Sequence, residues 1–121
     1  MTKTILTIDD SRTMREMLNH ALSGAGYRVL QAIDGVEGLE MLAANAADVV
    51  ITDINMPRLD GFGVIEGVRA DPRNRATPIL VLTTESDQAK KDRARQAGAT
   101  GWIVKPFNPD KLLDAVRRVG A

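Results

Sequence analysis

Short apolar runs alternate with longer amphipathic stretches along this chain. A run of four or five mostly apolar residues between turn residues is typical of a strand that is buried in a sheet. The run at 48–52, Asp-Val-Val-Ile-Thr, is apolar at its three central positions and is the clearest of these. The predicted strands are residues 5–8, 28–32, 48–52, 78–82 and 101–104.

Between the strands, apolar residues recur three and four positions apart, which is typical of one face of a helix. In the first helix Met17 belongs to this apolar stripe, and Ser11 is the predicted N-cap. Asn108 or Asp110 caps the last helix. The predicted helices include residues 14–22, 36–46, 64–68, 86–96 and 112–119.

The alternation of strand and helix repeats five times. Apolar strands joined by helices predict a parallel sheet with both faces covered, because a parallel connection needs a crossover helix. A chain of 121 residues fits one domain, since ~100–200 residues per domain is usual. We therefore predict an α/β fold of five β-α units in three layers, forming a single domain over residues 1–121 with no output domain.

The composition limits the possible partners. Lys+Arg and Asp+Glu both number 16, so a formal net charge of zero gives no electrostatic basis for binding nucleic acid or an anionic membrane. Cysteine is absent, which excludes disulfides, thiolate nucleophiles and cysteine-ligated metals. No apolar run approaches the ~20 residues of a membrane span, and the first residues do not resemble a signal peptide. We expect a cytoplasmic protein.

Polar residues follow four of the predicted strands. Asp9-Asp10 follows the first, Asp53 the third, Thr83-Thr84-Glu85 the fourth and Lys105-Pro106 the fifth. In open α/β sheets, ligands bind beyond the carboxyl ends of the strands. Each residue alone has an ordinary explanation, such as an acid at the start of a helix or a solvated loop lysine. Together they predict one site that contains three carboxylates, a hydroxyl pair and an ammonium group.

Charge balance indicates what this site binds. Two like charges ~4 Å apart repel by roughly 4 kcal/mol at an effective dielectric near 20. Lys105 offsets one of the three carboxylate charges, and a divalent cation offsets the rest. Oxygen ligands favour Mg²⁺, or Mn²⁺, and Mg²⁺ commonly binds one or two carboxylates together with a phosphate oxygen. The sequence therefore points to phosphoryl chemistry.

A carboxylate can act as the nucleophile by forming an aspartyl phosphate. Asp53 is the best candidate, because it stands alone at the end of the most buried strand. Asp9 and Asp10 would hold the metal, Thr83 would donate to one phosphoryl oxygen, and Lys105 would pair with another.

Other functions are weighed against this one. Gly61-Phe62-Gly63-Val64-Ile65-Glu66-Gly67 approaches a dinucleotide fingerprint, but its third glycine is one position late and it follows the third strand. A small-molecule aspartyl-phosphate phosphatase would carry a DxD nucleophile after the first strand, which Asp9-Asp10-Ser11 lacks. A flavin-binding module would need a phosphate-cradling first loop, whereas two aspartates there repel phosphate. The basic residues Lys90, Lys91, Arg93 and Arg95 form a solvated helix face or, alternatively, a docking face.

The chain resembles the receiver domains of two-component response regulators. The resemblance covers the whole chain and rests on Asp9-Asp10, the segment Asp53-Ile-Asn-Met-Pro-Arg-Leu-Asp-Gly61, Thr83 and Lys105-Pro106-Phe107. Thr83 and Lys105 lie 30 and 52 residues after Asp53, as in that family. The resemblance implies a flavodoxin-like sheet of strand order 2-1-3-4-5.

The resemblance also implies roles for individual residues. Asp53 would accept a phosphoryl group from a phosphohistidine of a sensor histidine kinase. Asp10, Asp53 and the backbone carbonyl of Asn55 would coordinate Mg²⁺, and Asp9 would act through water. Asn55 and Glu85 would modulate self-dephosphorylation. Thr83 and Trp102 would form the switch, and the bond before Pro106 would be cis.

Two positions depart from the family pattern. Trp102 stands where Tyr or Phe is usual, and its bulkier indole carries an N–H that needs a partner when buried. Ile54 replaces an aromatic residue of the chemotaxis members. We expect a monomeric signalling protein that catalyses only its own phosphorylation and dephosphorylation. Its expected target is the flagellar motor switch, and the alternative is a phosphate sink or phosphorelay intermediate.

Overall fold

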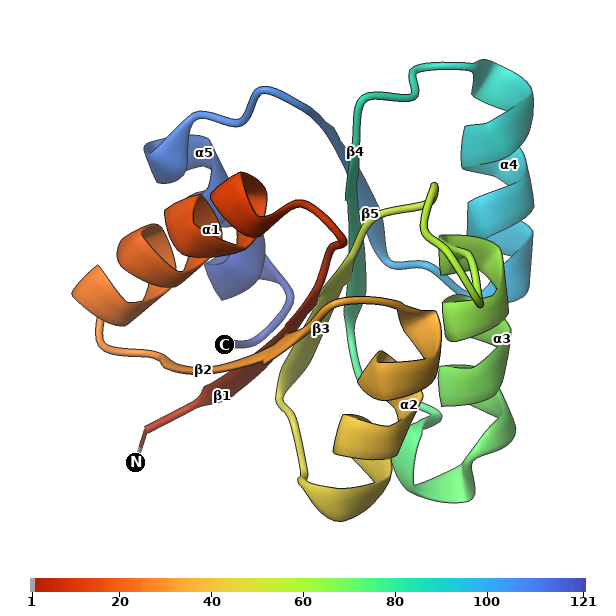
Figure 1. Cartoon of the computed structure of the whole chain (residues 1–121), viewed down its shortest axis with the longest axis horizontal. Helices are drawn as coiled ribbons and strands as arrows, with labels where there is room; N and C mark the ends of the chain where they lie inside the picture. Colours follow the sequence, from red (N-terminus) through yellow and green to blue (C-terminus); the bar gives the residue numbers. More distant parts are fainter. Residues whose placement is uncertain (1) are drawn as a thin grey trace.

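A computed structural model describes residues 2–121, and these form alternating strands and helices (Figure 1). The strands are parallel to one another and lie in the order β2-β1-β3-β4-β5. The predicted α/β fold and its strand order are therefore confirmed. The elements are β1 (Thr4–Ile8), α1 (Arg12–Gly24), β2 (Arg28–Ala32), α2 (Gly35–Ala44), β3 (Val49–Thr52), α3 (Gly61–Ala70), η1 (Pro72–Asn74), β4 (Ile79–Thr83), α4 (Gln88–Ala97), β5 (Gly101–Val104) and α5 (Pro109–Arg118).

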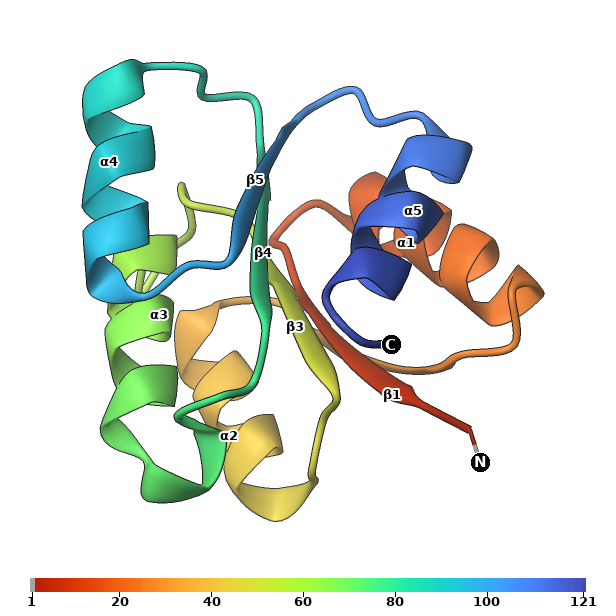
Figure 2. The same cartoon turned by 180° about the vertical axis from the view of Figure 1, so that it is seen from behind.

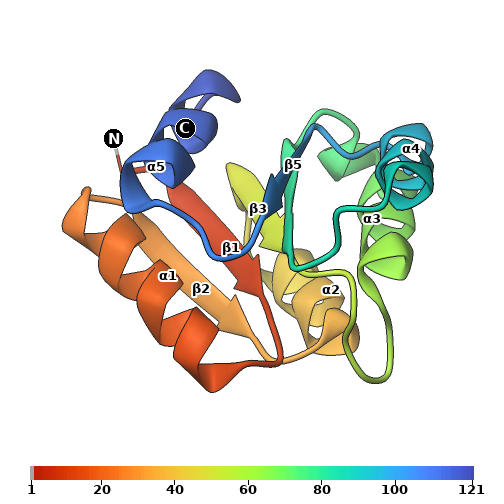
Figure 3. The same cartoon turned by 90° about the horizontal axis from the view of Figure 1, so that it is seen from above.

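The helices cover both faces of the sheet. Helices α1 and α5 pack on one face, and α2, α3 and α4 pack on the other, as the front and back views show (Figures 1 and 2). The view from above separates the three layers, with the sheet in the middle (Figure 3). No helix within residues 2–121 is both long enough and apolar enough to cross a membrane.

Two apolar clusters hold the layers together. One lies under α1 and α5 and includes Leu18, Leu22, Leu112 and Val116. The other lies under α2, α3 and α4 and includes the helix residues Leu42, Val64, Ile65, Val68 and Ala94. The central strands β1, β3 and β4 are buried along their whole length, because helices cover them on both faces. The central sheet therefore gives a rigid base for the residues that follow these strands.

Side-chain caps set where several helices begin. The Ser11 hydroxyl accepts a hydrogen bond from the N–H of Met14, which confirms the predicted cap of α1. Asn108, rather than Asp110, caps α5. Helix α4 begins two residues later than predicted, because the Asp87 side chain caps it by accepting from the N–H of Ala89. The prediction that Met17 belongs to the apolar face of α1 is wrong: Met17 is 45% exposed, since it lies at the edge of the stripe that Leu18 and Leu22 bury.

Candidate functional site

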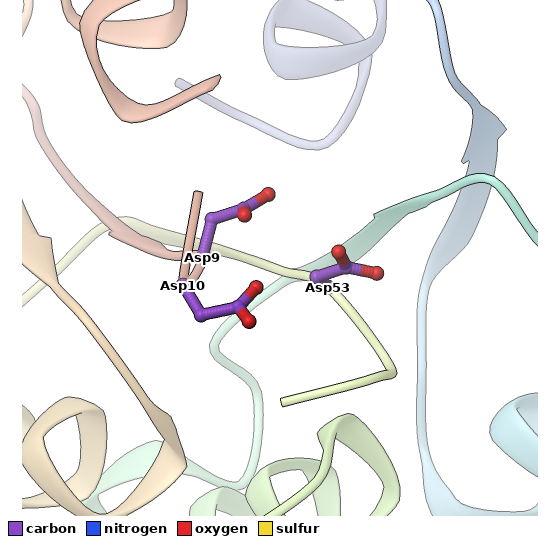
Figure 4. Close-up of side chains that lie close together, drawn as sticks. All are labelled: Asp9, Asp10 and Asp53. Carbon is purple, nitrogen blue, oxygen red and sulfur yellow. The ribbon is translucent and has the colours of Figure 1, made fainter. Parts of the chain in front are cut away.

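Three aspartates meet at the carboxyl edge of the sheet. Asp9 and Asp10 follow β1, and Asp53 follows β3, which is the neighbour of β1. The register places Ile8 beside Thr52, so the next residues of the two strands also lie side by side. Figure 4 shows the three side chains close together, with those of Asp9 and Asp10 extending toward Asp53, and one oxygen of each lies within 4.8 Å of the others.

The three carboxylates differ in exposure. Asp9 and Asp53 are buried, at 1% and 8% exposed, whereas Asp10 is exposed. A group of hard oxygen donors that is open on one side matches the preference of Mg²⁺, which keeps several waters when it binds. The donor set thus fits a divalent cation, with Asp9, Asp10 and Asp53 as the residues able to hold it.

Lys105 connects two of the carboxylates. Its Nζ lies 2.8 Å from an oxygen of Asp9 and 2.8 Å from an oxygen of Asp53. Burial acts to lower the pKa of Lys105, but the hydrogen bonds to Asp53 and Asp9 and their negative charges outweigh it and raise the pKa. The lysine therefore stays charged. The peptide bond between Lys105 and Pro106 is cis.

The surroundings of Asp9 disfavour its charged form. Burial raises the pKa of Asp9, and the hydrogen bonds from Lys105 and from the N–H of Ser11 offset this only in part. The nearby charge of Asp53 raises the pKa further. Without a bound metal ion, the negative charges of Asp9 and Asp53 thus repel each other, even with Lys105 between them.

Asp53 is oriented by its neighbours on both sides. One carboxylate oxygen accepts the N–H of Ile54 at 2.6 Å, and the other accepts the ammonium of Lys105. The first residue of α3, Gly61, lies directly against the backbone carbonyl of Asp53. Any side chain at position 61 would collide with that carbonyl, so only glycine allows the two backbone segments to approach this closely.

Glu85 links the rim of the site to the outer surface. Its N–H donates to the Thr83 hydroxyl at 3.3 Å, and its carbonyl accepts the indole N–H of Trp102 at 3.0 Å. Its carboxylate accepts from Asn55 at 2.9 Å and pairs with Lys90 at 3.1 Å. The hydrogen bonds from Asn55 and Lys90 hold the pKa of Glu85 below its usual range. Glu85 thus joins Thr83 and Asn55, which lie at the end of β4 and just after β3, to Trp102 and Lys90 of β5 and α4.

The two departures from the family pattern have clear surroundings. Trp102 is half-buried and packs against the apolar cluster under α2, α3 and α4, with its N–H bonded to Glu85. Ile54 is buried in the same cluster and is 2% exposed. The indole therefore has the partner that its burial requires.

The structure joins most of the residues that were picked from the sequence. Asp9, Asp53 and Lys105 are in direct contact, and Asp10 completes the carboxylate cluster. Thr83 is fully buried at the end of β4, where its hydroxyl contacts Glu85 rather than the cluster.

Sequence reasoning missed two neighbours of the site. The Arg15 guanidinium donates to the carbonyl of Asp9 at 2.7 Å, and Arg58 pairs with the buried Asp34. The sequence carries no periodic signal for the left-handed conformation of Arg58. It carries none for the contact between Arg58 and Asp34 either, because these residues lie in two loops and are 24 positions apart.

Comparison with known proteins agrees with this architecture. Residues 5–117 match the family described as response regulator receiver domain, and the chain belongs to this family. It is 44% identical over 117 residues to chemotaxis protein CheY1 of Helicobacter pylori, which covers 95% of this chain and 94% of that protein.

Solved structures give the same picture. Chemotaxis protein CheY4 of Vibrio cholerae superposes with a TM-score of 0.95 at 44% identity, covering 98% of this chain and 99% of the other. The receiver domain of a sensor histidine kinase from Pseudomonas aeruginosa superposes with a TM-score of 0.91 at 27% identity over the whole of both chains. That structure has a magnesium ion coordinated in its active site cleft. This chain is thus a CheY-like receiver domain.

Proposed function

We propose that this receiver domain takes a phosphoryl group from a phosphohistidine of a sensor histidine kinase onto Asp53, in a reaction that depends on Mg²⁺. The observation that carries the proposal is the contact of Lys105 with Asp53 within a cluster of three carboxylates. Such a cluster is unfavourable without a cation, so its presence in a folded site calls for a charged ligand.

The residues of the chain would divide the work of the transfer. An oxygen of Asp53 attacks phosphorus, the bond from phosphorus to the histidine nitrogen breaks, and the departing imidazole keeps the electron pair of that bond. Lys105 would then pair with a phosphoryl oxygen, and Thr83 would donate its hydroxyl to another. Asp10, Asp53 and the Asn55 carbonyl would hold Mg²⁺, with Asp9 acting through water. When bound, Mg²⁺ (or Mn²⁺) neutralises negative charge on the phosphoryl oxygens.

The phosphorylated state would differ at the outer surface through Glu85. If Thr83 turns toward a phosphoryl oxygen, its hydroxyl no longer accepts from the N–H of Glu85. The carbonyl of Glu85 accepts from Trp102 of β5 and its carboxylate pairs with Lys90 of α4, so β5 and α4 would sense the change. Hydrolysis, modulated by Asn55 and Glu85, would reset the switch.

The surface formed by α4, β5 and α5 suits a protein target. Grooves on both sides of Trp102 are bordered by cationic side chains, with Asp114 as an acidic neighbour. Those cations are Lys91, Arg95, Lys111 and Arg118. We propose that the phosphorylated protein binds an acidic segment of the flagellar motor switch in the cytoplasm, since its relatives are named as chemotaxis proteins.

Acetyl phosphate tests the chemical step. Incubation with acetyl phosphate and Mg²⁺ should add the mass of one phosphoryl group to the intact protein, and removal of Mg²⁺ with a chelator should abolish the gain. The Asp53→Asn variant should show no gain, and Asp110→Asn, which changes an exposed helix residue, should behave as wild type. A full mass gain in Asp53→Asn would refute the proposal.

A motility assay tests the target. Deleting the gene in a motile host should alter the balance of swimming and tumbling, and the Asp53→Asn variant should fail to restore it. Normal swimming and tumbling in the deletion strain would instead favour a phosphate sink or relay that does not reach the motor.

A further inference from the structure

The loop that follows Asp53 contains an unusual backbone conformation. Arg58 has a φ of 67°, and within residues 2–121 it is the one non-glycine residue with a positive φ. A residue with a Cβ is disfavoured there, so the surrounding structure must hold it in place. Loops that keep a disfavoured conformation are found most often at functional sites.

A bidentate ion pair holds this residue. The Nε and Nη2 atoms of Arg58 donate to the two carboxylate oxygens of Asp34, at 2.7 and 3.1 Å. Asp34 is 4% exposed and also caps α2 by accepting from the N–H of Glu37. The hydrogen bond from Arg58 holds the pKa of Asp34 below its usual range. A buried cap of α2 is thus tied to the tip of another loop.

The loop is fastened on both of its flanks. On the side of α2, a side chain at Gly35 would collide with Leu59, so the two backbones lie in close contact. On the side of α4, the Asn55 amide donates to Glu85. Between these ties the loop runs from Asp53 to the start of α3, past the residue whose carbonyl is the proposed metal ligand.

We propose that Arg58 is a positioning residue, which through Asp34 holds the loop of residues 54–60 in the conformation that lets Asn55 complete the cation site. This inference rests on the proposed function of the site. Arg58 does not touch the reacting atoms, and its effect passes through the backbone between positions 58 and 55. Residues that orient a metal ligand by a direct hydrogen bond commonly change metal affinity 10- to 100-fold when removed, and we expect Arg58, which acts through the backbone, to lie at the lower end of that range.

Two variants separate positioning from charge. Arg58→Gly removes the guanidinium but keeps a residue that favours positive φ, and Asp34→Asn keeps a good helix cap but removes the carboxylate. If only charge mattered, losing the cation would strengthen Mg²⁺ binding and losing the anion would weaken it. If the pair positions the loop, both substitutions weaken binding.

Calorimetric titration with Mg²⁺ alone gives the direct readout. We expect the Kd of Arg58→Gly and of Asp34→Asn to rise on the order of 10-fold, and the double variant to be no weaker than the weaker single variant, because both remove the same contact. In phosphorylation by acetyl phosphate, the half-saturating Mg²⁺ concentration should rise by the same factor, while the rate at saturating Mg²⁺ stays unchanged. Arg58→Lys, which retains one charged donor, should recover part of the affinity.

A second Arg–Asp pair provides the matched control. Arg73 binds the carboxylate of Asp71 with Nε and Nη2, and Asp71 is likewise a helix cap, but this pair follows the far end of α3. Arg73→Ala and Asp71→Asn should leave the Mg²⁺ Kd unchanged. Equal Kd values for wild type and Arg58→Gly, or tighter binding by Arg58→Gly, would overturn the inference and leave the function of Asp53 standing. Failure of the wild type to bind Mg²⁺ would overturn both.

Discussion

Two partly buried cations lie at opposite edges of the sheet and have opposite kinds of partners. Lys105, at the carboxyl edge, contacts the carboxylates of Asp9 and Asp53. Arg69, near the amino end of β4, donates to the backbone carbonyls of Asn74, Thr77 and Gly98. The carboxylates raise the pKa of Lys105, whereas burial lowers that of Arg69, which has only neutral partners.

The chemistry of the partners indicates which of the two cations lies in a site that can change its charge. The partners of Lys105 are ionisable, and the partners of Arg69 are not. Backbone carbonyls do not titrate and cannot be phosphorylated, so we expect the contacts of Arg69 to join α3, η1 and α4 in the same way whatever the state of the carboxylate site. The partners of Lys105 are carboxylates that repel each other, and we have proposed that this site takes up Mg²⁺ and that Asp53 accepts a phosphoryl group. The two edges should therefore respond differently to substitution, to Mg²⁺ and to pH.

The largest expected effect is at Arg69. Arg69→Leu removes four hydrogen bonds and leaves carbonyls without these donors, which should lower the free energy of unfolding by about 3–5 kcal/mol. Urea denaturation measures this loss, and it should be the same with and without Mg²⁺. A loss below about 1 kcal/mol would show that the carbonyls are satisfied equally well by water.

Lys105→Met should show the opposite dependence on Mg²⁺. Without the ammonium, two buried carboxylates lose their shared partner, and we expect a loss of about 2–3 kcal/mol in a chelator. Added Mg²⁺ should restore more stability to this variant than to wild type, because a ligand that binds the folded state stabilises it. Equal Mg²⁺ stabilisation of both proteins would contradict the view that lysine and metal balance the same charges.

The same contrast shows what the sequence could predict. Buried strands are visible as local apolar runs, and the predicted bounds of β2 and β5 are those of the structure. The cluster of Asp9, Asp53 and Lys105 could be placed because parallel strands bring their carboxyl ends to one edge. The contacts of Arg69 and the ion pair of Asp34 with Arg58 could not be predicted from the sequence, because they join loops and helix ends that are brought together only by the packing of the whole domain. The exposure of Met17 was missed for a related reason, since periodicity gives the face of a helix but not the width of its contact.

Asp9→Asn should make the protein more stable. The raised pKa of Asp9 means that the charged form is disfavoured in the folded state, so a neutral amide should raise the free energy of unfolding at neutral pH. The folded protein binds this proton more tightly than the unfolded chain, whose carboxyl has its usual pKa of 3.8. Wild type therefore gains stability from this group as the pH falls through its raised pKa, and the advantage of Asn should shrink.

Thermal unfolding across a pH series measures this trend. If the stability of Asp9→Asn relative to wild type instead increases as the pH falls, the folded protein stabilises the charged form of Asp9, which would contradict this prediction. Asp110→Asn, which alters an exposed carboxylate, serves as the control.

The smallest effect is expected at Trp102. Trp102→Phe keeps an aromatic ring but removes the donor to the Glu85 carbonyl, which should cost about 1 kcal/mol. Trp102 is the chain's one tryptophan, so its fluorescence in the wild type should change on phosphorylation if Glu85 carries the signal. If the tryptophan emission is unaltered after full phosphorylation, the effect of phosphorylation does not reach Trp102 through Glu85.

The central claim, that Asp53 becomes the phosphorylated residue, has a direct chemical test. Borohydride reduces an acyl phosphate to an alcohol, so a phosphorylated aspartate becomes homoserine. After treatment with acetyl phosphate and Mg²⁺, peptide mass spectrometry of the reduced protein should place homoserine at position 53. Homoserine at position 9 or 10, or at no position in a protein that has gained phosphoryl mass, would contradict the account.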